Sequence, residues 1–235
     1  SMQQRAGRAG RVQAGVCLKL YSSQTENTVM KATTEPELRR IPLEEVCLTV
    51  LAGGFAASCS EFFSQTPQPP TAESVVSALK ILECIGAITR PKASGSDAKS
   101  VETLTALGQH LAKLPVDARV GKMLIYGSLF RCTSAILTIA ASLSASKSPF
   151  QSSFLGNDSQ MKAAHASFSH PHSDFLTLTN VWDAFERADV KGETRKFCRE
   201  KFLNYAAMLE IRDSRLHFYD LLCDLGFVDR IGPDA

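Results

Sequence analysis

The sequence of 235 residues contains no CxxC pair and no cluster of histidine with cysteine. Neither a zinc site of ordinary spacing nor a disulfide framework is therefore indicated. The seven cysteines lie mostly within apolar stretches, which predicts reduced core thiols in a cytoplasmic or nuclear protein. They are Cys17, Cys47, Cys59, Cys84, Cys132, Cys198 and Cys223.

Long apolar runs are also missing. The longest, around Ala135–Leu143, is too short and too often interrupted by Ser and Thr to cross a bilayer. The N-terminus is polar and rich in arginine, unlike a signal peptide. Because Ser1 resembles a cloning remnant and a motif follows at once, we expect a piece excised from a longer protein.

A strong net charge is absent too, since the formal net charge is only +2. If a nucleic acid is a partner, the basic groups that bind it must gather locally. The sequence also has no GxxxxGK[ST] loop and no DExH tetrapeptide. The pair Gly121-Lys122 lies in a helical pattern without the preceding glycine of such a loop, so nothing in the chain cradles a β-phosphate or holds Mg²⁺.

What is present divides into three zones, of which the first covers residues 1–37. Apolar and polar residues partly alternate over Val16–Tyr21, which predicts a strand. The zone is too short to fold alone, and we interpret it as the edge of a preceding domain.

The second zone, residues 38–108, predicts a winged helix. Apolar residues recur at helical spacing over Leu43–Leu51 until Gly53-Gly54, and Ser60–Phe63 predicts a short helix or turn. After a proline-rich connector, Thr71 is a candidate N-cap for a helix that ends at Gly86. Two short strands are predicted next, separated by a polar loop over Lys92–Ser100. The strands span Ala87–Thr89 and Glu102–Thr105.

The third zone, residues 109–235, predicts a bundle of helices without a repeat period. Pro149, Pro171 and Gly192 lie in the connections, where helix breakers are expected. The predicted helices are Val116–Phe130, Ser134–Leu143, Asp158–Phe168, Asp174–Arg187, Gly192–Leu203 and Met208–Leu225. The predicted fold is therefore mainly α.

The segment most informative about chemistry is Gln4–Arg11, in which three arginines are separated by Gly and Ala. A guanidinium group presents a planar fork that matches phosphate oxygens, and glycine lets the backbone approach an anion closely. On composition alone, a flexible arginine- and glycine-rich tail that touches RNA loosely is an equally good interpretation.

This segment resembles motif VI of superfamily 2 helicases in its DEAH/RHA form, and the resemblance extends over nearly the whole chain. Further similar segments follow in the family's order. They are Glu35–Arg40, Pro42–Glu45, Leu104–Gly108, Leu114–Leu124, Leu137–Ser144, Lys147–Phe150, Phe168–Leu178 and Phe197–Leu203. The resemblance implies the end of a RecA-like domain, a winged helix and a helicase-associated helical domain, often called the ratchet.

The resemblance also implies roles for single residues. Arg8 and Arg11 are the expected arginine fingers that reach the γ-phosphate of ATP, and Gln4 helps to place phosphate or water, whereas Arg5 supports the motif. The implied cofactors are ATP and Mg²⁺ in the full-length protein. Since this chain lacks the other ATP-binding motifs, we expect it neither to hydrolyse ATP nor to unwind RNA by itself.

RNA is the implied partner, bound through phosphates and 2′-OH groups without sequence preference. The candidate contacts are Arg119, Lys122, Ser142 and Lys147, and each is also explained by an ordinary surface position. Further implied partners are the preceding RecA-like domains, a following OB-fold of the same protein and an activator protein.

The main alternative is a binding module without motor function, in which the winged helix engages nucleic acid or a protein through residues near Lys80. Other suggestive residues favour structural roles. His170 and His172 lack a third ligand, so no metal site is predicted, and Asp117 is a candidate N-cap. Trp182 and the Phe62–Phe63 pair are expected to be buried.

Overall fold

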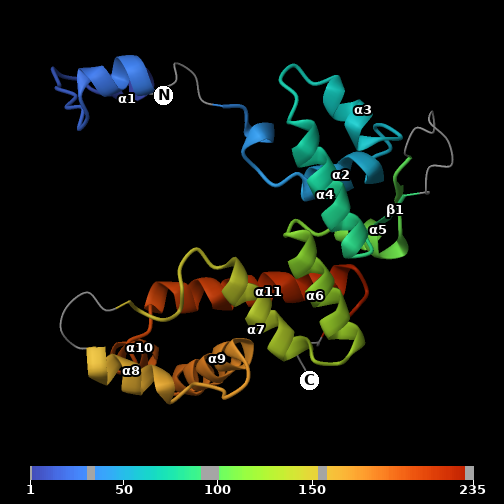
Figure 1. Cartoon of the computed structure of the whole chain (residues 1–235). Helices are drawn as coiled ribbons and strands as arrows, with labels where there is room; N and C mark the ends of the chain where they lie inside the picture. Colours follow the sequence, from blue (N-terminus) through green and yellow to red (C-terminus); the bar gives the residue numbers. More distant parts are fainter. Residues whose placement is uncertain (1, 31–34, 91–100, 153–157, 231–235) are drawn as a thin grey trace.

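The computed structural model describes residues 2–30, 35–90, 101–152 and 158–230. Helices dominate these residues, as the sequence predicts, and a two-stranded sheet accompanies them. Figure 1 shows one lobe that holds α2–α5 and a second lobe that holds α6–α11, with α1 apart from both. Within the described ranges, no helix is long and apolar enough to cross a membrane.

The N-terminal zone contains only short helical segments among its described residues. These are α1 (Met2–Ala6), the π-helical turn η1 (Thr25–Val29) and the 3-10 turn η2 (Glu37–Arg39). The strand predicted over Val16–Tyr21 is wrong, because these residues form no strand and Val16 and Leu20 are 84% and 96% exposed. A strand needs a neighbour for its N–H and C=O groups, and no described segment pairs with this one.

The first lobe is built on α2 (Glu44–Ala52), α3 (Cys59–Ser64) and α4 (Ala72–Cys84). The N-cap predicted at Thr71 is confirmed, since its Oγ1 accepts a hydrogen bond from the Ser74 N–H at 3.2 Å. Gly86 follows α4 with a φ of +77°, a left-handed conformation that glycine adopts without strain. The burial predicted for the phenylalanine pair is also confirmed, because Phe63 is buried and Phe62 is half-buried.

Both predicted strands are confirmed as an antiparallel pair, β1 (Ile88–Thr89) and β2 (Thr103–Leu104). The predicted loop over residues 92–100 lies outside the described residues. Glu102, just before β2, is buried, and its Oε2 accepts a hydrogen bond from the Cys59 N–H at 3.1 Å. This hydrogen bond connects the residue before β2 to the first residue of α3.

A short helix that the sequence analysis missed, α5 (Ala106–Leu111), follows the strands. Thr105 caps it by accepting a hydrogen bond from the Gly108 N–H at 3.0 Å. A Cβ at Gly108 would lie 2.0 Å from the Ala87 carbonyl oxygen, so only glycine lets α5 pack this closely. The domain division predicted after residue 108 falls inside this helix, and α5 contacts α2 and β2 as well as the helix that follows it.

The second lobe contains all six predicted helices, with ends that differ by a few residues. They are α6 (Ala118–Leu129), α7 (Thr133–Ser144), α8 (Asp158–Ala166), α9 (Asp174–Val190), α10 (Thr194–Glu200) and α11 (Tyr205–Asp224). Helix α7 packs against α6, α9 and α11. The N-cap predicted at Asp117 is confirmed by hydrogen bonds from the N–H groups of Arg119 and Val120.

Two hydrophobic cores meet at α6. Ile125 belongs to the core of the first lobe, and the adjacent Leu124 belongs to the core of the second. Leu221 and Phe227, at and beyond the end of α11, pack against both cores. The two lobes are therefore held together by apolar packing along α6 and the end of α11 (Figure 1).

Candidate functional site

The arginine motif lies on an exposed turn that follows α1. The Arg8 N–H donates to the Arg5 carbonyl oxygen at 3.1 Å, and Gly10 has a φ of +85°, so the chain turns sharply within the motif. The side chains of Arg8 and Arg11 are exposed, and Gln4 is exposed on α1. These guanidinium groups are therefore accessible to a phosphate that approaches from outside the chain.

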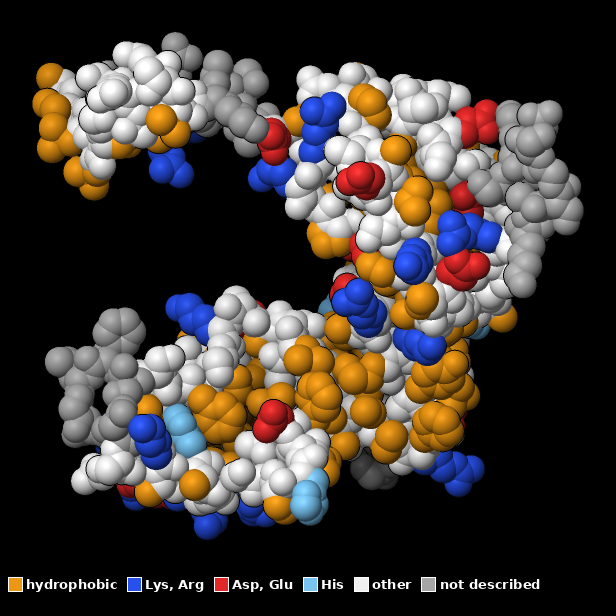
Figure 2. Space-filling model, in the orientation of Figure 1, with side chains coloured by type: hydrophobic (Ala, Val, Ile, Leu, Met, Phe, Trp, Pro, Cys, Tyr) orange, Lys and Arg blue, Asp and Glu red, His pale blue; other side chains and the backbone are white. Residues whose placement is uncertain are grey.

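The four candidate RNA contacts gather at one end of a helical hairpin. Helix α7 runs back along α6 after a connection of three residues, so the start of α6 and the end of α7 lie together (Figure 1). Arg119 and Lys122 lie in the first turns of α6, and Ser142 and Lys147 lie at or just beyond the end of α7. Figure 2 shows Lys and Arg side chains on the visible face near the junction of the two lobes.

Only two of these four side chains are exposed, namely Arg119 and Lys147. Lys122 is half-buried, and its Nζ donates to the Ile85 carbonyl oxygen at 2.7 Å. The same ammonium group lies 5.3 Å from the centroid of the Tyr126 ring. Lys122 therefore joins the end of α4 in the first lobe to α6 in the second.

Ser142 is engaged within its own helix, where its hydroxyl donates to the Thr138 carbonyl oxygen at 2.7 Å. Next to Lys147, the Ser146 N–H and hydroxyl donate to the Glu210 carboxylate at 2.9 and 2.7 Å. These hydrogen bonds and the charge of Lys147 lower the pKa of Glu210. The loop that carries Lys147 is thus tied to α11 while the ammonium group stays exposed.

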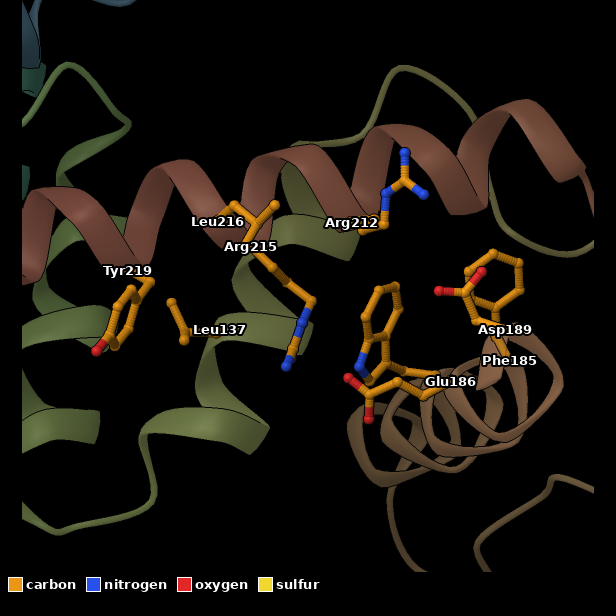
Figure 3. Close-up of a pocket in the computed structure, with 9 residues that line it drawn as sticks. Leu137, Phe185, Glu186, Asp189, Arg212, Arg215, Leu216 and Tyr219 are labelled. Atoms are coloured by element: carbon orange, nitrogen blue, oxygen red, sulfur yellow. The ribbon is translucent and has the colours of Figure 1, made fainter. Parts of the chain in front are cut away.

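A pocket between α9 and α11, closed on one side by α7, was missed by the sequence analysis. Its volume is about 310 Å³. Figure 3 shows Leu137 and Tyr219 on one side and Phe185 and Asp189 on the other, with Arg215 and Glu186 approaching from α11 and α9. The sequence offers a signal for it only in retrospect, since Phe185, Glu186 and Asp189 recur at helical spacing on one face of α9.

Trp182 forms part of the wall of this pocket. It is 5% exposed, which confirms its predicted burial. The Arg215 guanidinium carbon lies 4.5 Å from its ring centroid, a cation–π arrangement. Arg215 also donates to the Ser134 carbonyl oxygen at 2.8 Å and to the Thr138 hydroxyl. Burial lowers the pKa of Arg215, and the nearby carboxylates of Glu186 and Asp183 act in the opposite direction.

Metal ligands do not converge in the described part of the chain, where no group of three His, Cys, Asp or Glu side chains is placed to hold an ion. His170 and His172 lie beside each other, with ring centroids 6.2 Å apart. The His172 N–H donates to the His170 Nδ1 at 3.3 Å, and the His170 N–H donates to the Thr177 hydroxyl at 2.9 Å. These contacts organise the loop before α9.

All seven cysteines are free thiols. Cys47, Cys59 and Cys198 are buried, whereas Cys17, Cys84 and Cys132 are exposed, so the predicted core position holds for only part of the set. A hydrogen bond with Cys59, together with burial, raises the pKa of the Cys47 thiol. Burial alone raises the pKa of Cys198 to about 11. Both thiols are therefore protonated at neutral pH and serve packing.

Two protein-family models match parts of the two lobes. A model described as the winged-helix part of the helicase-associated domain (HA2) matches residues 78–116, and one described as its ratchet-like part matches residues 117–178. The DExH-box ATP-dependent RNA helicase DExH1 of Arabidopsis thaliana is 37% identical over 235 residues, which are 100% of this chain and 22% of that protein.

Two further relatives agree. The DExH-box ATP-dependent RNA helicase DExH4, chloroplastic, of Arabidopsis thaliana is 35% identical over 97% of this chain and 16% of its own length. The ATP-dependent RNA helicase DHX29 of Homo sapiens is 34% identical over 97% of this chain and 16% of its own length. The chain thus spans between 16% and 22% of the length of these relatives. This chain carries the winged-helix and ratchet-like parts of the helicase-associated domain, and over its whole length it is homologous to DExH/DEAH-box RNA helicases.

Proposed function

We propose that this chain is the part of an ATP-dependent RNA helicase that couples nucleotide turnover to movement along RNA. The similarity to RNA helicases over the whole chain is the observation that carries the proposal. The winged-helix and ratchet lobes form one wall of an RNA channel. RecA-like domains precede them in the full-length protein, an OB-fold follows, and an activator protein is a further candidate partner.

The arginine motif contributes to the ATP site of the full-length protein. Arg8 and Arg11 are exposed on their turn, and their guanidinium groups stabilise the charge that develops on the transferring phosphoryl group. Gln4 helps to place phosphate or water beside them. The chain's own residues do not complete the site, because the sequence has no phosphate-binding loop and no DExH tetrapeptide. ATP and Mg²⁺ are therefore held mainly by residues outside this chain, which alone is inactive.

ATPase measurements on the full-length protein test this role. Arg8→Ala and Arg11→Ala are each expected to lower kcat by roughly 10³–10⁵-fold, since an arginine finger contributes about that factor. ATP binding should change little. Arg187→Ala, at an exposed arginine of α9, is the matched control. Normal turnover in both motif variants would exclude the arginine-finger role.

RNA binding is assigned to the end of the α6–α7 hairpin. Arg119 and Lys147 are exposed there and are the proposed phosphate contacts, whereas Lys122 and Ser142 lie beside them with their donors already engaged. The logarithm of the RNA affinity falls as the logarithm of the salt concentration rises, with a slope of about −0.7 to −0.9 for each phosphate that a cation neutralises. Removing one such cation should therefore make the slope shallower by about that amount. Arg119→Ala and Lys147→Ala should each weaken RNA binding and reduce that slope, while Lys191→Ala should do neither.

The same titrations distinguish the proposed function from the binding-module alternative. Lys80 is exposed on α4, the helix that a winged helix would present to a ligand. Tight RNA binding by the chain that Lys80→Ala abolishes would favour the binding module. Weak, salt-sensitive binding that depends on Arg119 and Lys147 supports the proposed motor part.

A further inference from the structure

The end of α6 presents two aromatic side chains to solvent. Tyr126 is 39% exposed and Phe130 is 76% exposed. Their ring centroids lie 6.1 Å apart and the ring planes differ by 25°, so the two rings stack. The ammonium group of Lys122, four residues before Tyr126, lies 5.3 Å from the centroid of the Tyr126 ring. The three side chains therefore form a column along α6, and the exposed ring of Phe130 is its open end.

This column lies on the same face of α6 as the candidate phosphate contact Arg119. Because an α-helix turns by about 100° per residue, positions 119, 122, 126 and 130 fall within a sector about 80° wide. Positions 119 and 130 are roughly 16 Å apart along the helix axis. One strand of several nucleotides that contacts Arg119 can therefore extend along α6 to Phe130.

The charge of the hairpin has a single sign. The thirty residues from Ala118 to Lys147 contain four cations and no Asp or Glu. These cations are Arg119, Lys122, Arg131 and Lys147. Figure 2 shows hydrophobic side chains gathered over α6, with Lys and Arg side chains beside them. Exposed aromatic rings between cations fit a polyanion that carries flat apolar groups, and a single-stranded nucleic acid is such a ligand.

Arg131, which directly follows Phe130, has an unusual backbone conformation. Its φ is +57°, and its N–H donates to the Ser128 carbonyl oxygen at 3.1 Å. The Cys132 N–H donates to the Gly127 carbonyl oxygen at 2.9 Å, which completes a type of helix end that usually carries glycine at the left-handed position. Glycine would adopt this conformation without strain. Arg131 instead places an exposed guanidinium group next to Phe130 in the chain.

We propose that a base of single-stranded RNA stacks on Phe130 while Arg131 binds a neighbouring phosphate. The proposal deepens the proposed function and rests on it, since it takes RNA as the ligand. Stacking on aromatic rings beside cations holds single strands without reading their sequence. Tyr126 is a positioning residue, because its ring supports that of Phe130 from within the column.

Fluorescence anisotropy of labelled RNA bound to this chain tests the stacking. The probes are oligoadenylate, oligouridylate and an abasic ribose-phosphate strand of the same length. Stacking on one aromatic side chain accounts for about 5–150-fold in affinity, so Phe130→Ala should weaken oligoadenylate binding by that factor. Oligouridylate should lose less, and binding of the abasic strand should not change. Unchanged affinity for oligoadenylate, or an equal loss on the abasic strand, overturns the proposal.

Conservative variants separate stacking from apolar contact. Phe130→Tyr keeps an aromatic ring and should retain the affinity for oligoadenylate. Phe130→Leu keeps apolar bulk without a ring and should weaken binding as Phe130→Ala does; full affinity in Phe130→Leu would contradict stacking. Phe175→Ala, at a 51% exposed phenylalanine of α9, is the matched control and should bind RNA normally. Circular dichroism checks that each variant is folded.

Replacing Arg131 by glycine separates its contact with phosphate from its place at the helix end. Arg131→Gly relieves the left-handed strain, so Tm should stay the same or rise. The plot of log affinity against log salt should become shallower by about 0.7, the contribution of one phosphate of a single strand. Lys191→Ala, at an exposed cation beyond α9, should leave that slope unchanged. An unchanged slope in Arg131→Gly refutes the phosphate contact.

Other outcomes identify other occupants of this face. Dimerisation of the chain that Phe130→Ala abolishes, with RNA affinity unchanged, would show that a second copy binds here and would overturn the proposal. A fall in the Tm of the full-length protein but not of this chain, again with RNA affinity unchanged, would show that another domain covers Phe130 and would also overturn it.

The proposed function and this proposal fail separately. If Arg119→Ala and Lys147→Ala weaken RNA binding and Phe130→Ala does not, the stacking site is refuted and the proposed function stands. If Phe130→Ala weakens oligoadenylate binding and neither cation variant does, the stacking site stands and the assignment of RNA to the hairpin end is refuted.

Discussion

Replacing Lys122 by methionine tests whether this lysine joins the two lobes or binds RNA. The variant keeps the aliphatic stem beside Tyr126 and removes the ammonium group that donates to the Ile85 carbonyl oxygen at 2.7 Å. That carbonyl lies at the C-terminal end of α4, where a positive charge also interacts favourably with the helix dipole. Lys122→Met therefore removes a tether between α4 and α6.

The expected loss follows from the burial of the lysine. A hydrogen bond to a charged group contributes about 1.5–3 kcal/mol, and half-burial reduces this to about 1 kcal/mol. For a chain of this size, 1 kcal/mol corresponds to a fall in Tm of about 2–4 °C. RNA affinity should change less than in Arg119→Met, which removes an exposed cation from the preceding turn of the same helix.

Thermal unfolding followed by circular dichroism and RNA titration at several salt concentrations measure the two effects. Arg119→Met is the matched control and should leave Tm unchanged while weakening RNA binding. If Lys122→Met leaves Tm unchanged and weakens RNA binding as much as Arg119→Met does, the role of Lys122 as a tether is refuted. The earlier interpretation of Lys122 as a phosphate contact would then be preferred.

Three further predictions concern contacts within the lobes. Gly108→Ala should lower the free energy of unfolding by about 3 kcal/mol or more, because a Cβ there would lie 2.0 Å from a backbone carbonyl oxygen; a urea midpoint close to that of the unmodified chain would contradict this packing. Glu102→Ala should cost about 1–3 kcal/mol, measured in the same way, since it leaves the buried Cys59 N–H without its acceptor. The lowered pKa of Glu210 predicts a stabilising contribution that is fully present above about pH 4.5 and is lost as pH falls through the folded-state pKa. Glu210→Gln should therefore reduce the difference between the Tm measured at pH 6 and the Tm measured at roughly pH 3. An unchanged difference would count against the contact with Ser146.

The sequence by itself predicted most of the helices, the strand pair β1–β2 and the family. Helical periodicity predicted α6–α11 within a few residues, because burying one face of a helix imposes the spacing of its apolar residues. Thr71 and Asp117 were identified as caps because a side-chain oxygen that precedes a helix satisfies N–H groups only a few residues away. The ordered motifs from Gln4 onward indicated the helicase family, which the relatives confirm.

The tertiary structure decided what depends on neighbours distant in sequence. Alternation over Val16–Tyr21 predicts a strand wherever a partner strand exists, and the described chain provides none. Helix α5 is too short for periodicity to reveal, and its place depends on the close approach of Gly108 to Ala87. The spacing of apolar and polar residues within a segment does not show whether a partner strand or a close backbone neighbour exists elsewhere in the chain.

The candidate sites were likewise predictable from the sequence only in part. Exposed cations at Arg119 and Lys147 could be predicted, but the engagement of Lys122 by Ile85 required the packing of one lobe on the other. The pocket beside Trp182 required α9 and α11 to pack on the same helix, α7, although the residues that line the pocket from the two helices are about thirty positions apart in the sequence. The amino-acid sequence determines which side chains lie on one face of a helix. Only tertiary packing determines which faces of different helices come together.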